Sequence, residues 1–281
     1  MNENQNLFGK IAGWQIVLIT IIFVFGNGFI VGTILSFDHH AYGAITLFCA
    51  DILFMFFLYK WFLREKISFK KLFGSIEFRM KDFFKIFGLV ILIEIFGISL
   101  DTIIAYFFPQ FVQNMDSVLT YFGAGWWLVF IGISIVILAP IYEEVLIRGI
   151  LMQYWAKKWN PSVGIILTSI FFTALHGEPK IFPQIFLLAL IFSIMYFKTN
   201  KLGASIIAHV INNSIAFFGF LIIVRFYGFE YFQSSQATAI DKNAFIGSLF
   251  WLVFSGIILG SYIWRNWPKK DSMIPYEVNP E

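Results

Sequence analysis

Charged residues are scarce in this chain. Only 13% of its 281 residues are Asp, Glu, Lys or Arg, whereas 59% are hydrophobic. Soluble domains carry roughly 25% charged residues, so this composition excludes an ordinary soluble enzyme and indicates a protein of the lipid bilayer. The net charge is only +3, and the basic residues are dispersed along the chain. We therefore expect no nucleic acid as a partner.

Cysteine is almost absent as well. The one cysteine, Cys49, lies in an apolar run and excludes an intrachain disulfide framework. We interpret its thiol as core packing. No internal repeat of about 20–50 residues, low-complexity tract or soluble domain is visible. These absences predict one integral-membrane domain over residues 1–281.

Long apolar runs are abundant instead. A bilayer core of ~30 Å needs helices of about 20 residues, so the chain has room for about eight spans. We predict an all-α fold, a polytopic membrane bundle of about eight transmembrane helices. The first span, near residues 11–37, is too long for a signal peptide and is interpreted as a retained signal anchor. The other spans are predicted at residues 43–62, 84–108, 126–155, 162–177, 181–198, 203–226 and 244–264.

Basic residues also indicate an orientation. The loop Lys60–Lys85 contains eight Lys or Arg residues, whereas the loop Pro109–Phe122 contains none. Loops rich in Lys and Arg stay in the cytoplasm. We therefore expect a multi-pass protein of the cell membrane with both termini in the cytoplasm.

Three short polar patterns interrupt the apolar runs. Ionisable groups inside a membrane cost several kcal/mol each and persist mainly where a function needs them. Counted along the predicted helices at ~1.5 Å per residue, the three patterns fall in one layer near the middle of the membrane. They read Glu143-Glu144-Val-Leu-Ile-Arg148, Phe172-Thr-Ala-Leu-His176 and His209-Val-Ile-Asn-Asn213.

Helical spacing predicts which of these groups point together. Glu144 and Arg148 are four residues apart, with the acid before the base, which is the favourable order for an ion pair. His209 and Asn213 share a helix face for the same reason. Glu143 is rotated by about 100° from Glu144, so it is free to face a different cavity.

A carboxylate, two imidazoles and an amide around one wet cavity favour hydrolysis. A buried Glu can act as a general base, and imidazole or amide donors can stabilise an oxyanion. The chain lacks the G-x-S-x-G elbow of serine hydrolases. It also lacks H-E-x-x-H and the GxGD sequence of intramembrane aspartyl proteases. Water is therefore the expected nucleophile.

The ordered set E-E-x-x-x-R, F-x-x-x-H and H-x-x-x-N resembles the signature of the CPBP family, the CAAX proteases and bacteriocin-processing enzymes. The resemblance covers about Trp126 to Phe218, the expected catalytic core at residues 126–218. One departure is Ile147, where the family often has an aromatic residue. The compact chain looks more like the bacterial branch of the family.

The resemblance implies an intramembrane endopeptidase and a role for each motif residue. Glu143 and His176 would activate the water, and His209 and Asn213 would stabilise the oxyanion. Glu144 and Arg148 would form a supporting pair, with Phe172 packed beside the site. The partners would be the lipid bilayer and a peptide or membrane-protein substrate, in CAAX-type processing, peptide maturation or bacteriocin self-immunity.

Two alternatives stay open at this point. Glu143, His176 and His209 could together bind a divalent metal such as zinc with an open fourth position. We nevertheless expect no cofactor or metal, because the same groups suffice as base and oxyanion donors. The other alternative is a non-enzymatic immunity or transport protein that uses the same polar cavity. The roles of three further intramembrane acids also stay open, since they could line the cavity or form structural pairs. They are Asp51, Glu94 and Asp101.

Overall fold

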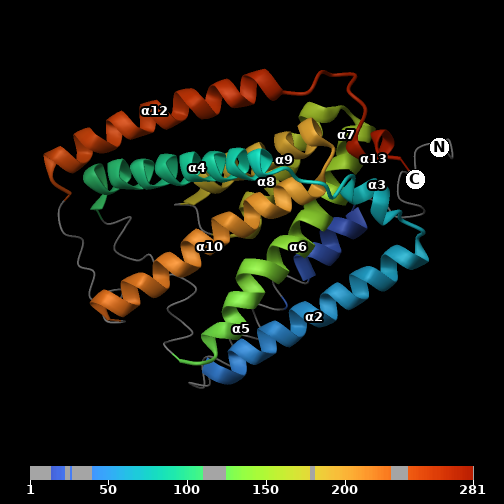
Figure 1. Ribbon diagram of the computed structural model, residues 1–281, viewed down its shortest axis with the longest axis horizontal. Coiled ribbons are helices and arrows are strands. Elements are labelled where there is room, and N and C mark those ends of the chain that lie inside the picture. The colour runs from blue at the N-terminus through green and yellow to red at the C-terminus, as the bar shows by residue number, and fades with distance from the viewer. Residues whose placement is uncertain are drawn as a thin grey trace.

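The protein is a helical bundle (Figure 1). Its computed structural model describes residues 14–22, 26, 40–109, 125–177, 181–228 and 240–280, and this part of the chain contains helices and no strand. The predicted all-α class is therefore confirmed. The helices before the candidate core are α2 (His40–Arg64), α3 (Phe69–Phe73) and α4 (Met80–Phe107), and those after it are α12 (Lys242–Asn266) and α13 (Pro275–Val278).

The candidate core consists of four helical stretches. The first runs through α5 (Leu128–Ile133), η4 (Ser134–Leu138), α6 (Ala139–Glu144), η5 (Val145–Met152) and α7 (Gln153–Lys158) without a break. The others are α8 (Pro161–Leu175), α9 (Phe182–Thr199) and α10 (Leu202–Tyr227).

Six of the described helices are long and apolar enough to cross a membrane, and the chain is a multi-pass membrane protein. They are α2, α4, the stretch Leu128–Lys158, α9, α10 and α12. The predicted span at 162–177 is α8, which has only 15 residues and is shorter than a bilayer requires. The predicted span at 11–37 lies mostly outside the described residues, of which 14–22 are helical.

Local sequence signals explain where α8 begins and why it is short. The side chain of Asn160 accepts a hydrogen bond from the backbone N–H of Val163, and Pro161 follows at the first helical position. Both features are typical of helix starts. At the other end, Gly177 has a φ of +66°, a conformation that glycine adopts easily. The helix therefore ends at Leu175, just before the motif histidine.

The stretch from α5 to α7 contains two π-helical segments, η4 and η5. In η4 the N–H of Ala139 binds the carbonyl of Ser134, five residues back, and the following residue is Pro140, which has no N–H. The carbonyl of Ile135 thus loses both of its intrahelical donors. π-Helices are rare in proteins, and those that do occur often lie at functional sites.

The core of the bundle surrounds η5, all eight residues of which are buried. Large apolar side chains from α9 and α10 pack around it, whereas many phenylalanines of α2, α4 and α12 are exposed on the outside, as expected for lipid-facing helices. Cys49 is also exposed, on α2, so the interpretation of its thiol as core packing is wrong. Whether a residue faces the core or the lipid depends on its position around the helix. A helix that is apolar on all sides has no sequence periodicity that indicates which face is buried.

Candidate active site

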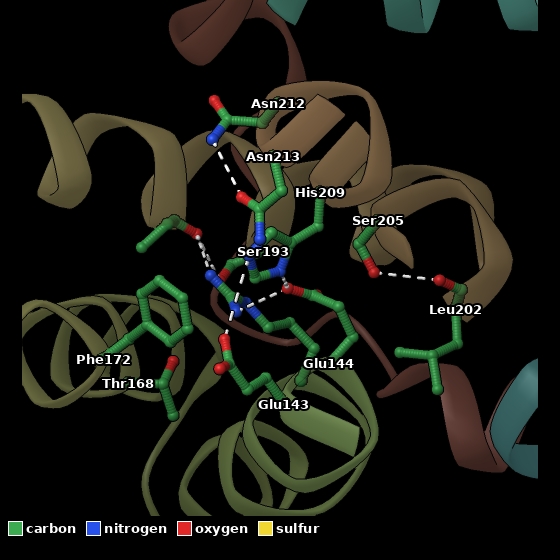
Figure 2. Close-up of polar contacts among 12 residues, drawn as sticks. Glu143, Glu144, Thr168, Phe172, Ser193, Leu202, Ser205, His209, Asn212 and Asn213 are labelled. Carbon is green, nitrogen blue, oxygen red and sulfur yellow. Dashed lines mark hydrogen bonds and ion pairs between the residues drawn. The ribbon is translucent and has the colours of Figure 1, made fainter. Parts of the chain in front are cut away.

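Glu144 is the centre of a buried ion-pair network (Figure 2). Its Oε1 lies 2.7 Å from Nη1 of Arg148 and 2.9 Å from Nδ1 of His209. The side chains of Glu144 and Arg148 are completely buried, and that of His209 is 5% exposed. The predicted pair between Glu144 and Arg148 is therefore present, and His209 joins it from α10.

Arg148 is enclosed on several sides. Its Nη2 donates to the backbone carbonyl of Ala189 at 3.4 Å. Its Cζ atom lies 4.4 Å from the centroid of the Phe172 ring and 5.9 Å from that of Phe192. A guanidinium over aromatic faces gains cation–π attraction, which is stronger where water is excluded. Packing against Phe172 thus helps to keep the charge of Arg148 in the core.

Glu143 points in a different direction from Glu144, as the helical phase predicted. Its side chain is 26% exposed and lines a cavity of about 170 Å³. Its Oε2 lies 3.8 Å from Nε2 of His209, beyond the length of a direct hydrogen bond. The other residues that line this cavity are Thr20, Tyr142, Leu146, Ile147, Phe172, Leu175 and His176.

His176 lies one residue beyond the end of α8, on the wall of the same cavity. Its Nδ1 is 2.9 Å from the carbonyl of Phe172, the unpaired carbonyl one turn earlier in the helix. Its ring centroid is 4.8 Å from that of Phe172. The F-x-x-x-H spacing therefore fixes the imidazole, because the phenylalanine supplies both a ring that packs against it and a backbone acceptor.

The two histidines have the same hydrogen-bond arrangement. Nδ1 of His209 faces a carboxylate oxygen and Nδ1 of His176 faces a carbonyl oxygen, and both oxygens only accept hydrogen bonds. Each Nδ1 must therefore carry a proton. A neutral imidazole then has a free lone pair on Nε2, and a protonated one has an additional Nε2–H donor. Both states leave the chemically active atom on the Nε2 side.

Asn213 has its amide orientation fixed by two neighbours. Its Nδ2 donates to the carbonyl of Ile135 at 2.9 Å, and its Oδ1 accepts from Nδ2 of Asn212 at 3.2 Å. The Ile135 carbonyl is the one that η4 and Pro140 leave without an intrahelical donor. One N–H of the Asn213 amide remains after these contacts.

The structure thus brings together the motif residues of three helical stretches, Leu128–Lys158, α8 and α10. Residues that the sequence reasoning missed are Phe192, the carbonyls of Ala189 and Ile135, and Tyr142 beside Glu143. The sequence contains a local signal for one of them, the carbonyl of Ile135. Pro140, five residues later, has no N–H to donate to it. Asp51 is buried next to Tyr142 and Ser134, whereas Glu94 and Asp101 lie on α4. None of these three acids is among the cavity-lining residues.

A metal ion would find its best donors in Glu143 and the Nε2 atoms of His176 and His209. Two histidines and one glutamate are a known zinc-ligand combination, and the Nδ1 contacts to Glu144 and Phe172 are of the kind that orient metal ligands. In the described part of the chain, however, no three His, Cys, Asp or Glu side chains are gathered closely enough to hold a metal ion.

Known proteins resemble the segment that carries these motifs. Residues 125–215 match the family model described as Rce1-like, type II CAAX prenyl endopeptidase. An uncharacterized 24.3 kDa protein of Escherichia coli is 30% identical over 83 residues, which cover 28% of this chain and 38% of that protein. UPF0177 protein YbdI of Lactococcus lactis is 26% identical over 142 residues, 47% of this chain and 73% of that protein. No solved structure gives a significant match.

The matched segment encloses the Glu-Glu, Phe-His and His-Asn patterns of the site. The family is one of membrane-embedded proteases, in agreement with the six candidate membrane spans. The predicted resemblance to the CPBP family is confirmed over residues 125–215, the segment that matches the Rce1-like model of type II CAAX prenyl endopeptidases.

Proposed function

We propose that the protein is an intramembrane endopeptidase in which Glu143 activates a water molecule for attack on a peptide bond. The observation that carries this proposal is the position of His209. Glu144 holds its Nδ1 at 2.9 Å, and its Nε2 faces Glu143 across 3.8 Å beside an open cavity. A water molecule in the cavity can then contact both side chains.

In this mechanism Glu143 takes a proton from the water as its oxygen attacks the carbonyl carbon of the substrate. The carbonyl π electrons move to oxygen and give a tetrahedral oxyanion. Collapse of that intermediate breaks the C–N bond, and the proton on Glu143 passes to the leaving amine. Catalysis of this kind typically contributes 10²–10⁴-fold in rate.

His209 and Asn213 serve as donors for the oxyanion. His209 donates from Nε2 when its ring is protonated, a state in which two carboxylates, Glu143 and Glu144, face two cations, Arg148 and His209. This balance leaves no uncompensated charge in the core, where an unpaired charge is costly. Asn213 contributes the second N–H of its side-chain amide, the one that does not bind the carbonyl of Ile135. His176 assists proton transfer from the opposite wall of the cavity.

The substrate we propose is a membrane-associated peptide or protein that enters from the cytoplasmic half of the membrane. Support for this comes from the Rce1-like segment and from the basic residues at the end of the bundle that contains α3 and α13 (Figure 1). Both termini would lie in the cytoplasm. The cleavage would serve CAAX-type processing, peptide maturation or bacteriocin self-immunity.

The test uses the full chain, reconstituted in lipid, with Glu143→Gln as the matched variant. Membrane peptides are incubated with each protein, and new peptide ends are identified by mass spectrometry. We expect ends that form with the wild type and are absent with the variant. If both proteins give the same peptides, the alternative of a non-enzymatic immunity or transport protein gains the support.

A further inference from the structure

A second cavity lies away from the candidate active site, where α4 begins and where α9 and α12 end. Its volume is about 400 Å³. Figure 1 shows α4 and α12 side by side along their lengths, so the cavity opens at one end of this helix pair. The end in question is also the one that contains α3 and α13. The cavity is therefore at one end of three helices that are long and apolar enough to cross a membrane, α4, α9 and α12.

This groove has an excess of positive charge. It is lined by one carboxylate, that of Asp82, which pairs with Arg79 at 3.0 Å between Oδ2 and Nε. Three further cations, Lys85, Lys198 and Lys201, line the same groove. These like charges repel one another, so an anion that binds among them lowers the electrostatic energy of the cluster.

The three lysines keep their charge uncompensated. Lys201 donates to the backbone carbonyl of Glu77 and lies over the ring of Phe78, with its Nζ 5.1 Å from the centroid. Both partners are neutral. Lys85 and Lys198 are exposed, and neither forms an ion pair with any described residue. Their ammonium groups are thus available to a ligand.

Below the lysines the groove becomes apolar. Ile86 and Met195 form its buried wall at 5% and 3% exposure, and Leu89 lines it further along α4. Leu89 is nine residues after Met80, which places it roughly 13 Å along the helix from its start. Tyr262 on α12 also lines the groove. The groove therefore combines a cationic rim with an apolar interior.

Two other surface hollows lack this charge pattern. The hollow beside Trp61 contains one cation and one anion, Arg64 and Glu65, which lie 3.7 Å apart. The hollow beside Phe73 also contains one of each, Lys70 and Glu77. General surface basicity of the protein does not explain the difference, because all three hollows lie at the same end of the bundle.

We propose that this groove binds one anionic phospholipid. The phosphate contacts Lys85, Lys198 and Lys201, and an acyl chain lies along Leu89 and Met195. Basic pockets between transmembrane helices bind the headgroups of anionic lipids in this manner. A soluble anion or an acidic peptide would use the cationic rim and leave the apolar interior unfilled.

The experiment measures lipid binding to the purified full chain in non-ionic detergent by native mass spectrometry. The probes are phosphatidylglycerol, phosphatidylcholine, inorganic phosphate and a glutamate-rich peptide. We expect one molecule of phosphatidylglycerol to bind in preference to the other probes. Each lysine near an anionic lipid contributes roughly five-fold in affinity, so Lys85→Gln with Lys198→Gln should weaken binding on the order of 30-fold.

Two further variants make the result specific to the groove. Lys81→Gln with Lys269→Gln removes the same number of exposed charges outside the groove and should leave the affinity unchanged. Leu89→Trp fills the apolar part with all lysines intact and should also weaken lipid binding. The proposal is overturned if the two lysine pairs behave alike, if Leu89→Trp has no effect, or if phosphate or the peptide binds as tightly as the lipid.

Discussion

Glu144 and His209 are 65 positions apart in the sequence and share a 2.9 Å contact between Oε1 and Nδ1. This contact fixes the proton of His209 on Nδ1 and directs Nε2 toward Glu143. The two adjacent glutamates of the motif therefore have different contacts. Glu143 faces the cavity, and Glu144 orients the histidine and neutralises Arg148.

The first prediction concerns Glu144→Gln. The amide keeps the shape of the side chain and loses the charge that orients His209, so we expect kcat to fall about 10–100-fold, as for other residues that orient a catalytic or metal-bound group. Glu143→Gln should fall further, by about 10²–10⁴-fold, because it removes the general base. The measurement is peptide cleavage at saturating substrate. Equal rates for the two variants would contradict the division of roles.

The second prediction concerns the buried ion pair. Arg148→Ala leaves the carboxylate of Glu144 in the core without its guanidinium, a change that costs about 3–5 kcal/mol when both groups are buried. We expect poor accumulation and a lower Tm. The double variant Glu144→Gln with Arg148→Met removes both charges and should regain much of the loss.

Membrane immunoblots and thermal unfolding in detergent distinguish these variants. Cleavage should remain low in the double variant, since His209 has lost the charge of its partner Glu144, so stability and activity separate. If Arg148→Ala alone is as abundant as the wild type, the pair contributes little to stability.

The third prediction concerns Asn213. Its amide is held by the carbonyl of Ile135, which depends on the π-helical turn and on Pro140. Asn213→Ala should lower kcat about 10²–10³-fold, the usual cost of removing one oxyanion donor. Asn212→Ala removes only the neighbour that contacts Oδ1 and should cost much less. A reversed order of these two variants in the cleavage assay would remove Asn213 from the proposed mechanism.

The sequence predicted the contacts that lie within one helix. The pair of Glu144 with Arg148 and the divergence of Glu143 both follow from helical spacing, and both are present. Apolar runs likewise located the long helices α2, α4, α9, α10 and α12 and the stretch Leu128–Lys158, whereas the short helix α3 was not predicted. These features depend on local geometry, so a single sequence contains the information for them.

Contacts between helices could not be predicted in the same way. Nothing in the sequence near Glu144 indicates that its second partner is His209, and nothing near Arg148 indicates Phe192. The π-helical segments were missed because their register depends on one hydrogen bond that shifts by one residue. The predicted span at 162–177 ends two residues too late, because α8 ends at Leu175 and the sequence pattern did not reveal the positive φ of Gly177.

The last prediction separates water activation by side chains from metal-assisted hydrolysis. In the proposed mechanism Glu143 acts as the base and His209 as an oxyanion donor, so protein dialysed against a strong chelator should keep its activity. Elemental analysis should then show far less than one equivalent of metal per chain. A zinc site made by Glu143, His176 and His209 predicts the opposite, because bound zinc is what lowers the pKa of its water to ~7. Activity would disappear on chelation and return with stoichiometric Zn²⁺.

His176→Ala distinguishes the two cases further. Loss of a zinc ligand would abolish the zinc dependence together with activity, whereas loss of an assisting imidazole would leave a slower, chelator-resistant enzyme.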